Sequence, residues 1–183
     1  FYTGGAKVIP VCHGDKITPD ALRRTLPHWH TGDVHQPQAG ALSITNTTER
    51  GNLYTLDEIT ALTAIAREVG MAVHLDGARF GNACVKLGCP AEMSWKAGAD
   101  VAVFGGTKNG CMGVEAVIFF NPEQAQGLPF RRMRAGHLLS KHRYLAAQMN
   151  AYLAEGLWLD LAARANATCD LLVNGLRDLG IEL

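Results

Sequence analysis

The sequence predicts an α/β fold in which a mostly parallel sheet is flanked by helices. Short apolar runs at residues 41–45 and 71–75 have the length and composition of buried strands, and residues 101–104 and 115–120 are two further strand candidates. Helical patterns separate the first three runs, and strands that alternate with helices are typical of parallel sheets. After residue 122 the pattern is entirely helical, so we expect the whole sheet to precede it.

The clearest predicted helix follows the first strand. Residues Thr55 to Glu58 fit a capping box, in which a hydroxyl and a carboxylate satisfy amide groups that a helix start leaves unpaired. Apolar residues then recur at helical spacing until Gly70, which is the expected end of this helix. Shorter helices are expected near residues 19–26 and 79–87.

The longest helical pattern covers residues 157–179, and we expect it to lead towards a missing C-terminal domain. We therefore divide the chain into residues 1–155, which form part of a larger domain, and residues 156–183, which form a connecting helix. The chain begins with Phe1 rather than Met and stops where a further strand would begin. For this reason we expect a fragment of a longer protein.

The balance of charges gives no sign of a polyanionic partner. Lys and Arg together number 17, as do Asp and Glu, so that the formal net charge is zero. We therefore expect neither nucleic acid nor a membrane as a partner, and no apolar run is long enough to cross a bilayer. The five cysteines include no CxxC pair, which argues against a disulfide framework or a cysteine zinc site and favours a reducing, cytoplasmic compartment.

Two polar loops each follow a predicted strand. One is the run from His74 to Arg79, and the other runs from Gly105 to Gly110 and contains Lys108. In open α/β sheets, ligands bind at the carboxyl ends of the strands. We therefore expect the polar side chains of the two loops to converge on one crevice.

The residue types in these loops suit pyridoxal phosphate (PLP). This cofactor needs a lysine amine to form an imine with its aldehyde, and a carboxylate to keep its pyridine nitrogen protonated. Lys108 and Asp76 supply these two groups, and Arg79 could hold an anionic group of the cofactor or the substrate. Because residues i and i+2 of a strand share a face, His74 should point the same way as Asp76 and is a second catalytic candidate.

Each of these residues also has an ordinary structural explanation. Lys108 could be a surface lysine, and Asp76 could only cap the following helix, since Asp favours that position. Arg79 could lie on a helix surface, and His74 could be a core histidine with satisfied hydrogen bonds. We favour the cofactor interpretation for the first three mainly because of a family resemblance, which is given below, and leave the function of His74 open.

Other sites are less well supported. His28, His30 and His35 invite a metal interpretation, but no carboxylate or cysteine pattern accompanies them, so we expect no metal site. The glycines before Lys108 lack the spacing and the Ser or Thr of a GxxxxGK[ST] phosphate loop. A nucleotide-binding role is therefore disfavoured.

Segments along nearly the whole chain resemble the threonine aldolase and β-eliminating lyase family of fold-type I PLP enzymes. In order, they are FYTGGAKVIPV at the start, ITNTTERGNLYTLDEI at 44–59, HLDGARFGNA and FGGTKNG at the two polar loops, and RRMRAGHLLSKHRYLAAQ at 131–148. The resemblance implies the PLP-dependent transferase fold, with residues 1–155 as part of its large, cofactor-binding domain. It also implies that further ligands come from segments outside this chain.

The resemblance assigns a role to single residues. It implies that Lys108 holds the cofactor as a Schiff base, that Asp76 faces the pyridine nitrogen, and that Arg79 contacts O3′ or a carboxylate. It further suggests Asn46 as a polar contact near the ring and Thr107 as a cofactor contact.

The same resemblance implies a reaction. It is the aldol cleavage of a β-hydroxy-α-amino acid, such as threonine, to glycine and an aldehyde, by a homo-oligomer that is a dimer or a tetramer. Two alternatives stay open: a fold-type I lyase that performs β-elimination, and a non-catalytic subunit that keeps the same scaffold.

Overall fold

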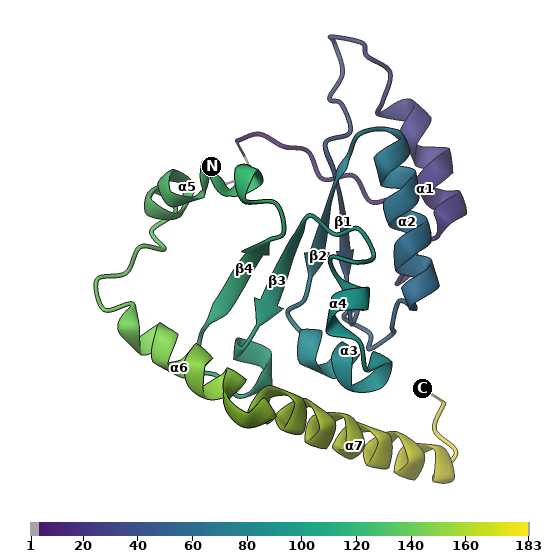
Figure 1. Ribbon diagram of the computed structural model, residues 1–183. Coiled ribbons are helices and arrows are strands. Elements are labelled where there is room, and N and C mark those ends of the chain that lie inside the picture. The colour runs from purple at the N-terminus through teal and green to yellow at the C-terminus, as the bar shows by residue number, and fades with distance from the viewer. Residues whose placement is uncertain (1–3, 183) are drawn as a thin grey trace.

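The computed structural model describes residues 4–182, which form one mixed sheet with helices packed against it (Figure 1). Within these residues the sheet has four strands in the order β1 (Ala41–Thr45), β2 (Ala72–Asp76), β3 (Val101–Gly105) and β4 (Glu115–Phe119). β1, β2 and β3 run parallel, whereas β4 pairs antiparallel to β3 at the edge. The predicted mostly parallel α/β sheet is therefore confirmed.

The two faces of the sheet differ in burial. Side chains alternate along a strand, and Leu42, Ile44, Val73 and Leu75 all lie on the buried face. The intervening side chains, which include His74, are only partly buried or exposed. The first three apolar runs of the sequence thus form strands with one buried face, whereas β4 at the edge has no buried side chain.

The buried face is covered by helices that precede or follow the strands in the chain. α1 (Pro19–Thr25) packs against α2 (Leu56–Glu68), and both lie on the same side of the sheet (Figure 1). α3 (Phe80–Leu87) and the short α4 (Pro90–Met93) follow β2. The predicted capping box at the start of α2 is present, because the side chain of Thr55 accepts from the amide of Glu58 and the carboxylate of Glu58 accepts from the amide of Thr55.

The chain after residue 122 contains helices and no strand among its described residues, as predicted. After β4 come α5 (Leu128–Arg134), α6 (Arg143–Leu153) and the long α7 (Leu157–Asp178). α7 crosses the molecule at the carboxyl ends of the parallel strands and packs against α3 (Figure 1). The described part of the chain also contains four short 3₁₀ helices, namely η1 (Leu26–His28), η2 (Thr107–Asn109), η3 (Pro122–Ala125) and η4 (Ala154–Gly156).

Aromatic rings fill the space between the sheet and the last two helices. The ring centroid of Phe104 lies 5.7 Å from that of Phe80, 5.7 Å from that of Tyr152 and 5.4 Å from that of Trp158. Such ring pairs stabilise a core beyond the area they bury. α3, β3, α6 and α7 therefore meet at one cluster directly behind the strand ends.

A partly buried carboxylate ties β3 to β2. Asp100 precedes β3, and its Oδ2 accepts a hydrogen bond of 2.7 Å from the amide of Val73, while its Oδ1 accepts one of 2.9 Å from Arg67 Nη2. Burial by itself would raise the pKa of Asp100, but these hydrogen bonds outweigh it and hold the pKa below its usual value.

The predicted elements differ from the observed ones mainly at their ends. The second strand begins and ends one residue later than predicted, so that Asp76 is its last residue, and the fourth ends at Phe119. α4 has no counterpart in the sequence predictions, since it is too short to show a helical period. Residues 1–3, the start of the FYTGGAKVIPV segment, and Leu183 lie outside the described residues.

The division of the chain at residue 155 stays a prediction. Among residues 4–182, no helix combines the length and the apolar character that crossing a bilayer requires.

Candidate functional site

The two polar loops lie against each other, backbone to backbone. The amide of Gly105 donates a hydrogen bond of 3.0 Å to the carbonyl of Gly77. Neither glycine has room for a side chain: a Cβ on Gly77 would overlap the carbonyl oxygen of Val103, and one on Gly105 would lie 2.6 Å from that of Ala78. Glycine at both positions therefore allows the loop after Asp76 to pack against the loop that leads to Lys108.

Lys108 lies in η2, immediately after the end of β3. The turn is closed by Thr107, whose Oγ1 accepts a hydrogen bond of 3.1 Å from the amide of Val114. It ends at Gly110, whose φ of 109° favours glycine. The lysine side chain is exposed and lines a cleft, whereas the hydroxyl of Thr107 bonds within the loop.

Asp76 is held at the end of β2 by its neighbours. Its Oδ1 accepts a hydrogen bond of 2.9 Å from the amide of Ala78, and its backbone carbonyl accepts one of 3.0 Å from the amide of Asn46. The side chain is partly buried. One carboxylate oxygen is thus fixed by the loop backbone. Oδ2 has no hydrogen bond within the described part of the chain.

His74 shares the partly open face of the sheet with Asp76, as the sequence predicts. It pairs in register with Ser43 of β1, and its Nδ1 lies 2.9 Å from Ser43 Oγ. One ring nitrogen is therefore engaged by a serine hydroxyl.

Arg79 precedes α3 and carries a buried nitrogen without a hydrogen-bond partner. Its Nη1 is shielded from solvent and makes no hydrogen bond among residues 4–182. It forms a long ion pair with Glu49, whose Oε1 lies 3.8 Å away, which is too far for a hydrogen bond. A guanidinium with an unmet donor is a binding group for an anion.

Lys108 and Arg79 line the same cleft, which has a volume of about 350 Å³. Its other walls are the loop after β1, including Thr47, the outer side of α3, including Lys86, and the middle of α7, including Asp170. Three cations therefore face one carboxylate, which favours an anionic ligand. Asp76, His74, Asn46 and Thr107 are not part of this lining.

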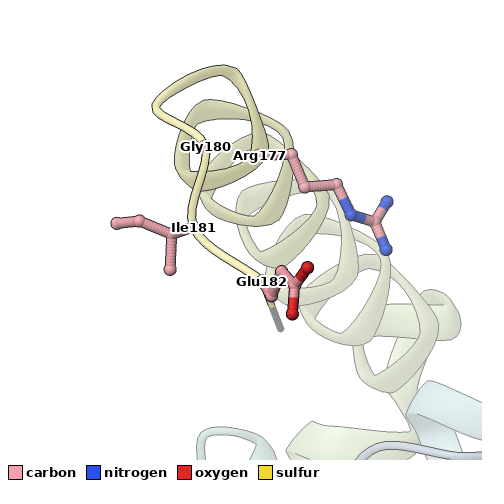
Figure 2. A pocket seen from close by; sticks show the side chains of 4 residues that line it. All are labelled: Arg177, Gly180, Ile181 and Glu182. Carbon is pink, nitrogen blue, oxygen red and sulfur yellow. The ribbon is translucent and has the colours of Figure 1, made fainter.

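A second hollow, of about 470 Å³, lies at the end of α7 (Figure 2). It is lined by Arg177, Gly180, Ile181 and Glu182, and the side chains of Arg177 and Ile181 point away from each other. Its described lining contains no residue from a strand end. The smaller cleft is therefore the candidate site, although the hollow is larger.

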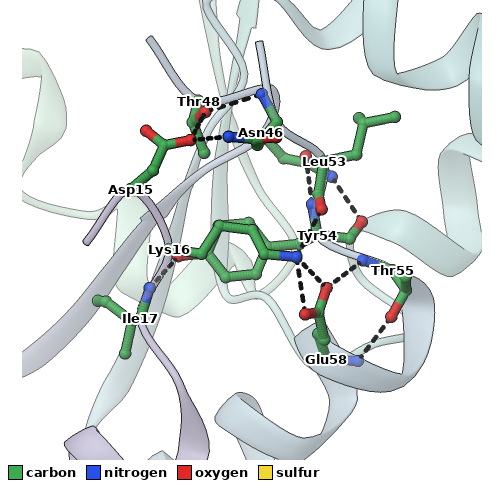
Figure 3. Close-up of polar contacts among 10 residues, drawn as sticks. Asp15, Lys16, Ile17, Asn46, Thr48, Leu53, Tyr54, Thr55 and Glu58 are labelled. Atoms are coloured by element: carbon green, nitrogen blue, oxygen red, sulfur yellow. Dashed lines mark hydrogen bonds and ion pairs between the residues drawn. The ribbon is translucent and has the colours of Figure 1, made fainter. Parts of the chain in front are cut away.

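The loop after β1 is held in place by a polar network (Figure 3). Lys16 Nζ donates to the carbonyl of Leu53 at 2.8 Å and to both carboxylate oxygens of Glu58 at 2.7 and 2.6 Å. The hydrogen bond from Lys16 lowers the pKa of Glu58. Thr48 Oγ1 donates to Asp15 Oδ2 at 2.5 Å. The segment around Asp15 and Lys16 thus fixes the wall of the cleft that carries Thr47 and Leu53.

Asn46 belongs to this network. It is fully buried, and its Oδ1 accepts a hydrogen bond of 3.1 Å from the amide of Tyr54, while its Nδ2 donates to the Tyr54 carbonyl at 3.4 Å. Both ends of the side-chain amide are therefore engaged by the backbone. The predicted contact of Asn46 with a cofactor stays a prediction, and the structure adds a role in shaping the loop.

The sequence analysis missed the buried residues that connect the lysine loop to α6 and α7 through hydrogen bonds. Asn109 follows Lys108 directly, and its buried amide reaches Tyr152 and the backbone of Trp158. A polar residue next to Lys108 in a buried loop was a signal that could have been followed. Its partners in α6 and α7 could not have been found from the sequence, because they are distant in the chain.

No cluster of three or more potential metal-binding side chains occurs among residues 4–182.

Comparison with known proteins places this site in a family. The family model described as "Beta-eliminating lyase" matches residues 1–183. The low specificity L-threonine aldolase of Pseudomonas sp. (strain NCIMB 10558) is 43% identical over 186 residues, which cover 100% of this chain and 53% of that protein. The corresponding protein of Pseudomonas aeruginosa is 41% identical, with the same coverage.

A solved structure is also similar. The threonine aldolase of Leishmania major superposes with a TM-score of 0.84 and 28% sequence identity, over 94% of this chain and 50% of that chain. The chain thus spans about half the length of the curated relatives it matches. Because the family model matches from the first residue to the last, the chain belongs to the beta-eliminating lyase family.

Proposed function

We propose that the protein containing this chain is a PLP-dependent aldehyde lyase that cleaves a β-hydroxy-α-amino acid, such as threonine, to glycine and an aldehyde. The observation that carries the proposal is that Lys108 and Arg79 line one cleft beside the loop that follows Asp76. The names of the relatives, low specificity L-threonine aldolases, support the choice of substrate.

The residues present fit the cofactor. The buried Nη1 of Arg79 is a donor without a partner, and three cations line the cleft, as a ligand with a phosphate requires. Lys108 is exposed to the cleft and supplies an amine. Asp76 keeps one carboxylate oxygen outside the hydrogen bonds of the described residues, which leaves it available to a protonated ring nitrogen.

When bound, PLP supplies an electron-accepting ring that stabilises negative charge at the substrate Cα. Lys108 would hold the cofactor through its side-chain amine. Asp76 would hold a proton at the ring nitrogen, because a carboxylate stabilises an adjacent positive charge. Arg79 orients an anionic group of the cofactor or the substrate.

His74 is the candidate for moving a proton. Its Nδ1 lies 2.9 Å from Ser43 Oγ. If Nδ1 carries the ring proton and donates to that hydroxyl, Nε2 is left unprotonated and can accept a proton. Ser43 would then set the tautomer of His74. We assign to His74 the removal of the β-hydroxyl proton, either directly or through a water.

The test is a product assay on the full-length protein with threonine. Glycine and acetaldehyde in equal amounts are expected, with no ammonia. Release of ammonia and a keto acid would instead support the alternative of β-elimination, to which the family description gives some weight. A preparation that retains no PLP and releases neither set of products would overturn the proposal in favour of a non-catalytic subunit.

We further propose a homo-oligomer in a reducing, cytoplasmic compartment. All five cysteines are free thiols, which suits such a compartment. Phe130 and Met133 of α5 are 80% and 63% exposed, and large apolar side chains at a surface favour association. Light scattering of the full-length protein will give its mass, and a monomer would contradict this part of the proposal.

A further inference from the structure

Asn109, the residue after Lys108, is buried and forms two hydrogen bonds behind the lysine loop. It is 7% exposed. Its Nδ2 donates to Tyr152 Oη at 2.6 Å and to the backbone carbonyl of Trp158 at 2.8 Å. The two hydrogens of the amide thus reach α6 and the start of α7. A side chain so fully engaged fixes the backbone that carries it.

Tyr152 extends the same chain of bonds to the other end of the loop. It is 2% exposed, and its hydroxyl donates to the carbonyl of Gly105 at 3.3 Å. Burial raises the pKa of Tyr152, so the hydroxyl stays protonated and able to donate. One hydroxyl therefore bridges Gly105 and Asn109, the two residues that enclose Gly106, Thr107 and Lys108.

The surroundings of these bonds are closely packed. A Cβ on Gly81 would lie 3.0 Å from Asn109 Nδ2, and one on Gly110 would lie 3.0 Å from Leu161 Cδ1. The ring of Phe104 packs against Tyr152 from the sheet side. If either hydrogen bond is lost, a buried polar group is left unpaired.

We propose that Asn109 and Tyr152 form a buried hydrogen-bonded pair that positions Lys108. The pair fixes both ends of the lysine loop to α6 and α7. Neither residue lines the cleft, so both act through Lys108 and are positioning residues. The proposal rests on the proposed function for the role of Lys108. The hydrogen bonds themselves do not depend on that role.

The decisive variant is Tyr152→Phe in the full-length protein, because it keeps the ring and removes only the hydroxyl. Tyr144→Phe is the matched control. It makes the same change in the same helix, where the side chain is 60% exposed and its hydroxyl forms no hydrogen bond among the described residues. In the cofactor-free protein, hydrogen exchange of the amides of residues 106–111 should become about tenfold faster in Tyr152→Phe and stay unchanged in Tyr144→Phe.

The cofactor-loaded protein gives a second readout. The pH midpoint of the visible absorbance of the lysine-bound cofactor should shift in Tyr152→Phe, because the amine is held less firmly. The kcat for threonine should fall about tenfold, with KM changing less. Asn109→Asp, which keeps the size but removes both donated hydrogens, should produce the same changes in the same direction.

Two results in Tyr152→Phe and Asn109→Asp would overturn the proposal: unchanged hydrogen exchange of residues 106–111, or an unchanged absorbance midpoint and kcat despite faster exchange. Faster exchange that is spread evenly over the sheet and helices, or loss of the folded state in these two variants, would also overturn it, because the pair would then support the whole fold. Retention of the cofactor by Lys108→Ala would instead refute the proposed function, and the exchange result in the cofactor-free protein would still stand.

Discussion

Gly105 donates its amide hydrogen to the carbonyl of Gly77 over 3.0 Å, and this one bond joins the loop after Asp76 to the loop that carries Lys108. The carboxylate and the amine come from neighbouring parallel strands, β2 and β3. Their loops therefore leave the same edge of the sheet. The proposed site depends on this contact, and the predictions that follow address the residues on either side of it.

Replacing Lys108 with Ala should abolish covalent retention of PLP. The amine is the only group at position 108 that can bond to the aldehyde. After borohydride reduction of the full-length protein, mass spectrometry should find the cofactor on the peptide that contains Lys108, and on none in Lys108→Ala. The control is Lys141→Ala, which removes an exposed lysine between α5 and α6. Labelling of a different lysine in the unmodified protein would refute the assignment.

Replacing Asp76 with Asn should weaken cofactor binding about 10- to 100-fold, the loss expected when a charged hydrogen bond becomes a neutral one. The amide cannot stabilise a protonated ring nitrogen as the carboxylate does. Fluorescence titration of the cofactor-free, full-length protein measures the dissociation constant. Asp20→Asn in α1 removes an exposed carboxylate and should leave it unchanged. Equal affinities for all three proteins would contradict the role of Asp76.

Gly77→Ala should lower the free energy of unfolding by about 1–3 kcal/mol or more, because the added methyl group overlaps the carbonyl oxygen of Val103. Gly40→Ala provides the comparison, since its Cβ would meet nothing within 4 Å. That control should change stability by less than about 0.5 kcal/mol. Urea unfolding followed by circular dichroism measures both values. A Gly77→Ala protein as stable as Gly40→Ala would show that the two loops can separate without cost.

Asp100 should make stability depend on pH in the acid range. Its pKa in the folded protein lies below the usual value, so its contribution is complete above the pKa of the unfolded chain, about 3.9. The contribution is then lost as the pH falls through the folded pKa. Asp100→Asn should therefore be less stable by about 1–3 kcal/mol at pH 7, and the difference should shrink below about pH 4.

Unfolding measurements on both proteins from neutral to acid pH will check this. A difference that stays constant across the range would mean that the charge of Asp100 does not stabilise the link between Arg67 and the amide of Val73.

The sequence was sufficient for the strands and for the two loops of the site. Buried strands show as short apolar runs, and glycines, Asp76 and Lys108 at their ends are local features that need no knowledge of the fold. The capping box at Thr55 is equally local and was found. Local chemistry also suggested Arg79, and the structure places it on the cleft with Lys108.

What the sequence could not supply was the partner of each polar group. Asn109 and Tyr152 are 43 residues apart, and no period or spacing connects them. Asn46 was suggested as a contact near the cofactor ring by the family resemblance alone, and this stays a prediction. That its amide pairs with the backbone of Tyr54 was not visible in the sequence, because this pairing depends on how the loop after β1 folds back.

The position of α7 also determines when the cleft can form during synthesis. Asn82 and Asn166 pair across 84 residues, and α7 supplies the last wall of the cleft, up to Asp170. A nascent chain on the ribosome therefore exposes the lysine loop, together with the rings of Phe80 and Phe104, until this helix has emerged and docked. A small ligand can therefore bind in the complete cleft only after α7 has docked.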